Sequence, residues 1–283
     1  MLLKVYFEIK KEAVTFCDRL FHYDKQLEIN WNTSKKFGVQ IVIDASNRTS
    51  QVQEVIVKAM ADVFIYHRET YWINHVVKRY YYFKNKEEIR KIVQLTQSII
   101  SGEDEDLGHI LKDKKPRNKL TSIFNENEEN GVIHFDSIVN FRMQPYQKEL
   151  IEVVGLAIDE FKREEEYQTF VQSLREFIEK KKSKCSVIHV LQGTNFTFYN
   201  SSGVPIRDRE LKAMIKKEPM YIFGLDEEEI NLTPLIAMAP EQIRIYGNDP
   251  SEPKTHAIIN IFQERVSFEP LEKFPFSDYQ KTR

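Results

Sequence analysis

The sequence has 283 residues, which is enough for one large domain or two to three smaller ones with an ample hydrophobic core. Its 41% hydrophobic and 30% charged residues are typical of an ordinary globular protein. The 41 basic and 43 acidic residues nearly cancel, which excludes a global electrostatic field that would attract nucleic acid or an anionic membrane surface.

The N-terminal part combines three strand-like patterns with one helical pattern. Residues alternate well enough from Met1 to Ile9 to predict a strand, and the charges of Lys4 and Glu8 argue against a signal peptide. A helix is expected next, followed by two short strands, "QLEINWN" and "FGVQIVID". We therefore expect a β-α-β-β segment over residues 1–47, too small to fold alone and packed on the region C-terminal to it.

Residues 48–182 are expected to form a mainly helical region. Its clearest helix runs through "NKEEIRKIVQLTQSIISG", where Asn85 suits the N-cap and Gly102 suits a left-handed C-terminal stop. After this helix an acidic run, "EDED", and a basic run, "KDKKPRNK", indicate a solvated connector around Pro116.

The preceding segment, "HRETYWINHVVKRYYYF", predicts a helix that is rich in aromatic residues. Tyr80 and Phe83 fall at helical spacing with Val76, so we expect them in the core.

The stretch from His134 to Ile178 carries two apolar helical stripes, one from Leu150 to Phe161 and one from Tyr167 onward. The stripes are out of phase, because continuing the first would bury the triple-glutamate run. A break or sharp bend near Arg163–Glu165 is predicted. It would place the glutamates at the start of a helix, where carboxylates favour the positive end of the dipole.

Strands alternate with helices in residues 183–283, which predicts a C-terminal α/β domain. The expected strands are "SVIHVL", "FTFYN", "QIRIYG" and "VSFEP", with "MYIFG" as a further candidate. Pro234 implies either a kinked helix or a helix that starts at Thr233. The expected fold class is α+β, a mainly helical middle flanked by the N-terminal β-α-β-β segment and this domain.

Arg142 stands inside an apolar run, "IVNFRM", which is an unusual place for a charge. We expect it to be buried or half-buried and paired with a carboxylate such as Glu165 or Glu166, since an unpaired buried charge costs roughly 3–5 kcal/mol. The alternative is an anion clamp, in which Arg142, Tyr146 and Glu165 line the ligand pocket of an enzyme.

Two basic patches leave a nucleic-acid-associated factor open as a second hypothesis. The segment Lys78–Lys84 mixes cations, led by Lys78 and Arg79, with three tyrosines, and Lys112–Lys119 has five cations in eight residues. The "EDED" run largely neutralises the second patch.

No motif for a metal or a phosphate is present. There is no His-Glu-x-x-His, Cys-x-x-Cys, EF-hand, Walker or Gly-x-Gly-x-x-Gly pattern, and no serine nucleophile elbow. Cys17 and Cys185 stand far apart, which favours free thiols in a reducing cytosol. We expect no metal site and no cofactor, and a non-enzymatic role ahead of an enzymatic one.

The order of features from about Ala61 to Pro270 resembles the YtxC-like family of sporulation proteins of endospore-forming bacteria. The likeness is carried by "YHRETYWINHVVKRYYYF", "FDSIVNFRMQPYQKELIEVVGLAIDEFKREEEYQTFVQSLREFI", "VIHVLQGTNFTFYNSSGVPI" and "LIAMAPEQIRIYG". It implies a cytoplasmic, sporulation-associated protein and supplies no catalytic residue or cofactor. Our leading hypothesis is a protein that acts through protein contacts, with an unidentified protein partner and no membrane insertion.

Overall fold

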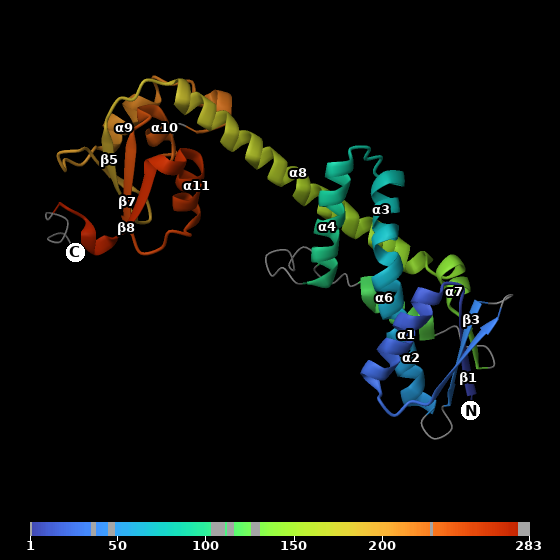
Figure 1. Cartoon of the computed structure of the whole chain (residues 1–283). Helices are drawn as coiled ribbons and strands as arrows, with labels where there is room; N and C mark the ends of the chain where they lie inside the picture. The colour runs from blue at the N-terminus through green and yellow to red at the C-terminus, as the bar shows by residue number, and fades with distance from the viewer. Residues whose placement is uncertain are drawn as a thin grey trace. The chain divides into compact units, whose positions relative to one another are not determined.

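Two four-stranded sheets and the helices around them make up the described part of the chain (Figure 1). The computed structural model describes residues 2–34, 38–44, 49–102, 111, 116–125, 131–226 and 229–276. It divides into two compact units, Met1–Arg163 and Glu164–Arg283, each with a hydrophobic core of its own. The predicted α+β class with a helical middle is confirmed.

The sheet of the first unit has the strand order β2-β3-β1-β4. The chain forms β1 (Leu2–Phe7), helix α1 (Lys10–Tyr23), β2 (Ile29–Ser34) and β3 (Gly38–Asp44), as the β-α-β-β pattern predicts. The fourth strand, β4 (Val132–His134), joins from far along the chain and pairs in parallel with β1, whereas β1–β3 and β2–β3 are antiparallel. Buried residues alternate along β1 and β3, so one face of the sheet packs on the core.

The helices of the first unit follow one another from the end of the sheet to the unit boundary. They are α2 (Thr49–Phe64), the π-helical turn η1 (Ile65–Glu69), α3 (Thr70–Arg79), α4 (Lys86–Ser101), α6 (Pro116–Asn125), α7 (Phe135–Phe141) and α8 (Gln144–Lys180). The side chain of Asn85 accepts hydrogen bonds from the first-turn amides of α4, and Gly102 ends the helix with a φ of 69°. Both predicted caps are therefore confirmed.

The connector predicted around Pro116 is only partly described. The acidic run and residues 112–115 lie outside the described residues. Pro116 itself is the first residue of α6, where its fixed φ suits a helix and its missing amide hydrogen costs nothing.

Helix α8 runs without interruption through the position of the predicted break. Residues 162–169 are all exposed, so the stripe before them packs in the core of the first unit and the stripe after them packs in the core of the second. The change of phase between the stripes therefore needs no bend. The prediction of a break near Arg163–Glu165 is wrong, and so is the placement of the three glutamates at a helix start.

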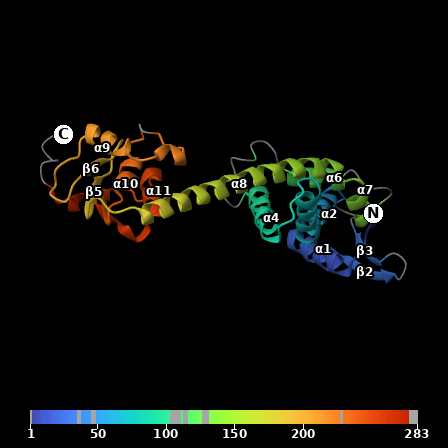
Figure 2. The ribbon, with the colours of Figure 1, turned by 90° about the horizontal axis from the view of Figure 1, so that it is seen from above.

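Figures 1 and 2 both show the first half of α8 lying against α4. The ammonium group of Lys91 on α4 lies 5.9 Å from the centre of the Phe161 ring on α8. The apolar faces of these two helices belong to the same core as the sheet.

The second unit contains a sheet of order β6-β5-β7-β8. Three strands are parallel, and β6 is antiparallel to β5. Its elements are β5 (Val187–Leu191), β6 (Thr197–Tyr199), α9 (Asp208–Ile215), η2 (Met220–Phe223), α10 (Thr233–Met238), β7 (Gln242–Gly247), α11 (Pro253–Phe262), η3 (Gln263–Arg265), β8 (Val266–Pro270) and η4 (Leu271–Lys273).

Two details of the second unit bear on the sequence predictions. Helix α10 starts at Thr233 with Pro234 in its first turn, which is the second of the two predicted possibilities. The segment "MYIFG" is a 3₁₀ turn, not a strand, because it lies between Pro219 and Gly224, whose φ of 67° ends it.

Candidate functional site

A single π-helical turn organises the polar interior of the first unit. The turn η1 lies in a continuous rod between α2 and α3. Its last three residues, His67, Arg68 and Glu69, all make polar contacts with other elements of the unit. Such turns are rare inside α-helices and are frequent at functional sites.

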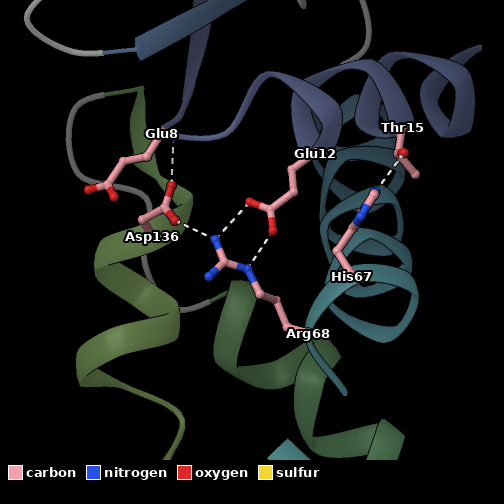
Figure 3. Close-up of polar contacts among 6 residues, drawn as sticks. All are labelled: Glu8, Glu12, Thr15, His67, Arg68 and Asp136. Atoms are coloured by element: carbon pink, nitrogen blue, oxygen red, sulfur yellow. Dashed lines mark hydrogen bonds and ion pairs between the residues drawn. The ribbon is translucent and has the colours of Figure 1, made fainter. Parts of the chain in front are cut away.

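Arg68 lies between two carboxylates that come from distant parts of the chain (Figure 3). Its Nε and Nη2 donate to the two carboxylate oxygens of Glu12 on α1, and Nη2 also donates to Asp136 Oδ1 at 2.8 Å. Asp136 Oδ2 accepts the backbone amide of Glu8 at 2.7 Å. Hydrogen bonding to Glu12 raises the pKa of Arg68, so the guanidinium stays charged.

Both carboxylates around Arg68 are shielded from water, with Glu12 2% and Asp136 7% exposed. Beside them, His67 Nε2 and Thr15 Oγ1 lie 2.8 Å apart, which adds a second link between η1 and α1. These contacts tie the helical rod to α1 and to α7.

Glu69, the next residue along the turn, forms a second buried cluster. Its side chain is 1% exposed and accepts from Arg117 Nη2 at 2.8 Å and from the Tyr146 hydroxyl at 2.8 Å. Burial raises the pKa of Tyr146, which keeps the phenol neutral and a hydrogen-bond donor. The carboxylates of both clusters have cationic partners, so they hold helices in place and are poorly suited to proton transfer.

A groove of about 470 Å³ lies on the surface between α3 and α4. Ile89 and Val93 are almost fully buried in its floor, and Gln97 Nε2 donates to Thr70 Oγ1 at 2.9 Å across one end. Three of its lining residues are cations and none is a carboxylate. The lining residues are Thr70, Asn74, Lys78, Lys86, Ile89, Arg90, Val93, Gln94 and Gln97.

The turn that joins α3 to α4, residues 80–85, presents aromatic side chains to water, and we call it the aromatic turn. Tyr82 has a φ of 59° and is 78% exposed. A left-handed conformation is uncommon for a residue with a side chain. Its neighbour Tyr81 is anchored, because its hydroxyl donates to the carbonyl of Ile151 at 2.8 Å and lies over Gly155, where a Cβ would come within 2.6 Å of it.

Two residues of the aromatic turn test the prediction that Tyr80 and Phe83 lie in the core. Phe83 packs against the core as a partly buried residue, whereas Tyr80 is 47% exposed. The prediction fails for Tyr80 because α3 ends at Arg79, so the helical spacing does not continue through the turn.

The sequence-predicted residues do not gather at one place. Lys78 and Arg79 are exposed at the end of α3, and Lys78 lines the groove. Tyr146 lies fully buried beside Glu69.

Arg142 is exposed, so its predicted role as a buried structural cation is wrong. It follows the last residue of α7, Phe141, which is itself 76% exposed, so the apolar run around Arg142 does not mark a buried face. Glu165 and Glu166 are exposed on α8, more than twenty residues further along the chain.

The sequence patterns did not identify the charged residues that form the two polar clusters of the interior, namely Glu12, Arg68, Glu69, Arg117 and Asp136. One signal was available, since Glu12 falls on the apolar stripe that continues through the buried residues of α1. Among the described residues no group of three or more His, Cys, Asp or Glu side chains could hold a metal ion.

Comparisons with known proteins identify the same family that the sequence resembles. The model of the YtxC-like family matches residues 54–267. The chain is also 30% identical over 278 residues to the uncharacterized protein YtxC of Bacillus subtilis (strain 168), covering 96% of each chain. No solved structure matches, and no described helix is long and apolar enough to cross a membrane. The chain belongs to the YtxC-like family.

Proposed function

We propose that this chain is a cytoplasmic, sporulation-associated protein that acts by binding another protein, and that the aromatic turn is the centre of its contact surface. The observation that carries the proposal is the exposure of Tyr80 and Tyr82 beside the cations Lys78 and Arg79. Tyrosine and arginine are enriched among the residues that contribute most to protein interfaces. The sporulation role is proposed because the resemblance of the sequence to the YtxC-like family implies it.

The backbone of Tyr82 supports a role for its side chain outside the fold. A residue other than glycine held in the left-handed region costs on the order of 1–3 kcal/mol and persists only where its surroundings impose it. Here Tyr81, anchored to α8 by its hydroxyl, and the capped start of α4 at Asn85 hold the two ends of the turn. A strained residue whose ring is in water contributes little to folding, which favours a role in recognition.

The second candidate is a nucleic-acid-associated factor that uses the same surface. Cations next to exposed aromatic rings are also the composition that binds phosphates and stacks on bases. The segment 112–115, part of the second basic patch, lies outside the described residues. An enzyme built on Arg142 ranks last, because Arg142 is exposed whereas Tyr146 is fully buried beside Glu69.

Site-specific crosslinking separates these candidates. A photoreactive phenylalanine analogue replaces Tyr82 in one version of the full chain and Tyr221, which is 80% exposed in the second unit, in a control version. Each version is irradiated in sporulating cells, and the lysate is divided into nuclease-treated and untreated halves. We expect a discrete protein adduct at position 82 that survives nuclease and is absent at position 221. An adduct that disappears with nuclease would support the nucleic-acid factor, and equal adducts at both positions would contradict the proposal.

The sporulation role is tested separately by counting heat-resistant spores in a strain that lacks the gene. We expect a reduced count that the wild-type chain restores and a Tyr82→Ser chain does not. A normal count without the gene would contradict the role in sporulation.

A further inference from the structure

We propose that the groove between α3 and α4 binds an acidic segment of the partner protein, with the carboxylates of that segment at the end formed by Lys78, Lys86 and Arg90. The inference rests on the proposed protein contact and gives the chemistry of the bound segment. It is drawn from the distribution of charge, amides and apolar surface along the groove.

The two ends of the groove differ because the helices run in opposite directions. Thr70 at the start of α3 is bridged by Gln97 near the end of α4, which closes one end with neutral groups. Lys78 near the end of α3 lines the groove together with Lys86, the first residue of α4. The cationic end is therefore the end at which the aromatic turn joins the two helices.

The cationic end has positive charge to offer to a ligand. Lys78, Lys86 and Arg90 line it, and none of the lining residues is acidic. Arg90 contacts Glu87 at 3.0 Å, but both side chains are more than half exposed. An exposed pair of this kind contributes little and is readily exchanged for another carboxylate.

The rest of the groove suits a polypeptide. Ile89 and Val93 provide an apolar floor for a side chain, and the amides of Asn74 and Gln94 can donate to and accept from a peptide backbone. A nucleic acid carries a charge on every phosphate and would need cations along the whole track, whereas here they gather at one end. The surface therefore fits an acidic protein segment better than a nucleic acid.

The test measures fluorescence anisotropy of labelled probes titrated with the full chain at low salt. The probe is a twelve-residue peptide in which Asp and Glu alternate with Leu. Two further probes are the same peptide with Asn and Gln in place of the acids, and a single-stranded oligothymidylate. We expect the acidic peptide to bind, the neutral peptide to bind at least about tenfold more weakly, which is about 1.4 kcal/mol, and binding to weaken as salt is added.

Variants then place the binding in the groove. Lys78→Glu with Lys86→Glu reverses the cationic end, and Gln94→Glu adds a carboxylate to the middle with almost no change of shape. The control, Lys10→Glu with Lys11→Glu, makes the same change of net charge on exposed residues of α1. Circular dichroism confirms that each variant is folded. We expect the groove variants to weaken binding at least about tenfold and the control to change it less than about twofold.

Three outcomes would overturn the inference. They are equal losses in the groove and control variants, no binding of the acidic peptide, and tighter binding of the oligothymidylate that the groove variants abolish. A crosslink at Tyr82 that survives nuclease, combined with either of the first two outcomes, would keep the proposed protein contact and reject only the groove. Loss of that crosslink would reject the proposed contact itself.

Discussion

Replacing Tyr146 by phenylalanine removes one hydroxyl from the interior of the first unit and leaves the ring in place. That hydroxyl donates to Glu69 Oε1 at 2.8 Å, and the two residues are 0% and 1% exposed. A hydrogen bond to a charged group contributes about 1.5–3 kcal/mol, and water cannot replace it at a site this well buried. We expect the free energy of unfolding of the first unit to fall by about 2 kcal/mol.

Urea unfolding followed by tryptophan fluorescence measures this change directly. Both tryptophans of the chain, Trp31 and Trp72, lie in the first unit, so the signal reports on that unit alone. The matched control is Tyr81→Phe, which removes a half-buried hydroxyl that donates to the neutral carbonyl of Ile151. The control should cost about 0.5–1.5 kcal/mol. If Tyr146→Phe costs no more than Tyr81→Phe, the reasoning about the buried carboxylate is refuted.

Arg68→Ala should lower the free energy of unfolding of the first unit by about 3 kcal/mol in urea unfolding, because it leaves two shielded carboxylates without their cation. The control Arg142→Ala, at an exposed position, should change that free energy by less than about 0.5 kcal/mol. Equal losses in the two variants would contradict this prediction. A Gly→Ala substitution such as Gly155→Ala would ordinarily stabilise a helix by about 0.4–1 kcal/mol. Here the new Cβ would lie 2.6 Å from the Tyr81 hydroxyl, so we expect a loss of stability instead. Removing that hydroxyl by Tyr81→Phe in the double variant should reduce the loss. Burial and, to a smaller extent, the positive charge of the neighbouring Arg244 lower the pKa of His189 below its usual 6.5. The imidazole of the unfolded chain is therefore protonated at a higher pH than the imidazole of the folded chain. The second unit should therefore lose thermal stability as the pH falls below about 6.5, and His189→Gln should flatten that dependence; an unchanged slope would refute it.

Local features of the fold could be predicted because neighbouring residues determine them. Asn85 and Gly102 end α4 as expected, and Thr233 starts α10 because Pro234 belongs in a first turn. The break predicted in α8 came from treating two stripes as parts of one core. A pattern of apolar residues gives the phase of each stripe, but it does not say which core the stripe meets.

The candidate site was harder to predict because it depends on contacts between distant residues. Arg68 meets Glu12 across 56 positions and Asp136 across 68, and no spacing rule connects them. Arg142 was singled out because its neighbours in the sequence are apolar, although Phe141 beside it is largely exposed. The cations of the groove were recognised in part, through Lys78, since a basic cluster is visible in one stretch of sequence.

The π-helical turn η1 also sets the rotational phase of the helix after it. Each residue of an α-helix advances the chain by about 100° around the axis, and a turn closed by i→i+5 hydrogen bonds holds one residue more than an α-helical turn. The wide turn therefore absorbs one extra residue, and α3 keeps the orientation against α2 that a regular helix with one residue fewer would give it. Deleting one residue from Ile65–Glu69 would restore regular α-helical geometry and leave Thr70, Asn74 and Lys78 in the groove. It would also remove the turn that presents His67, Arg68 and Glu69 in succession, so at least one of their contacts should be lost while the groove is kept.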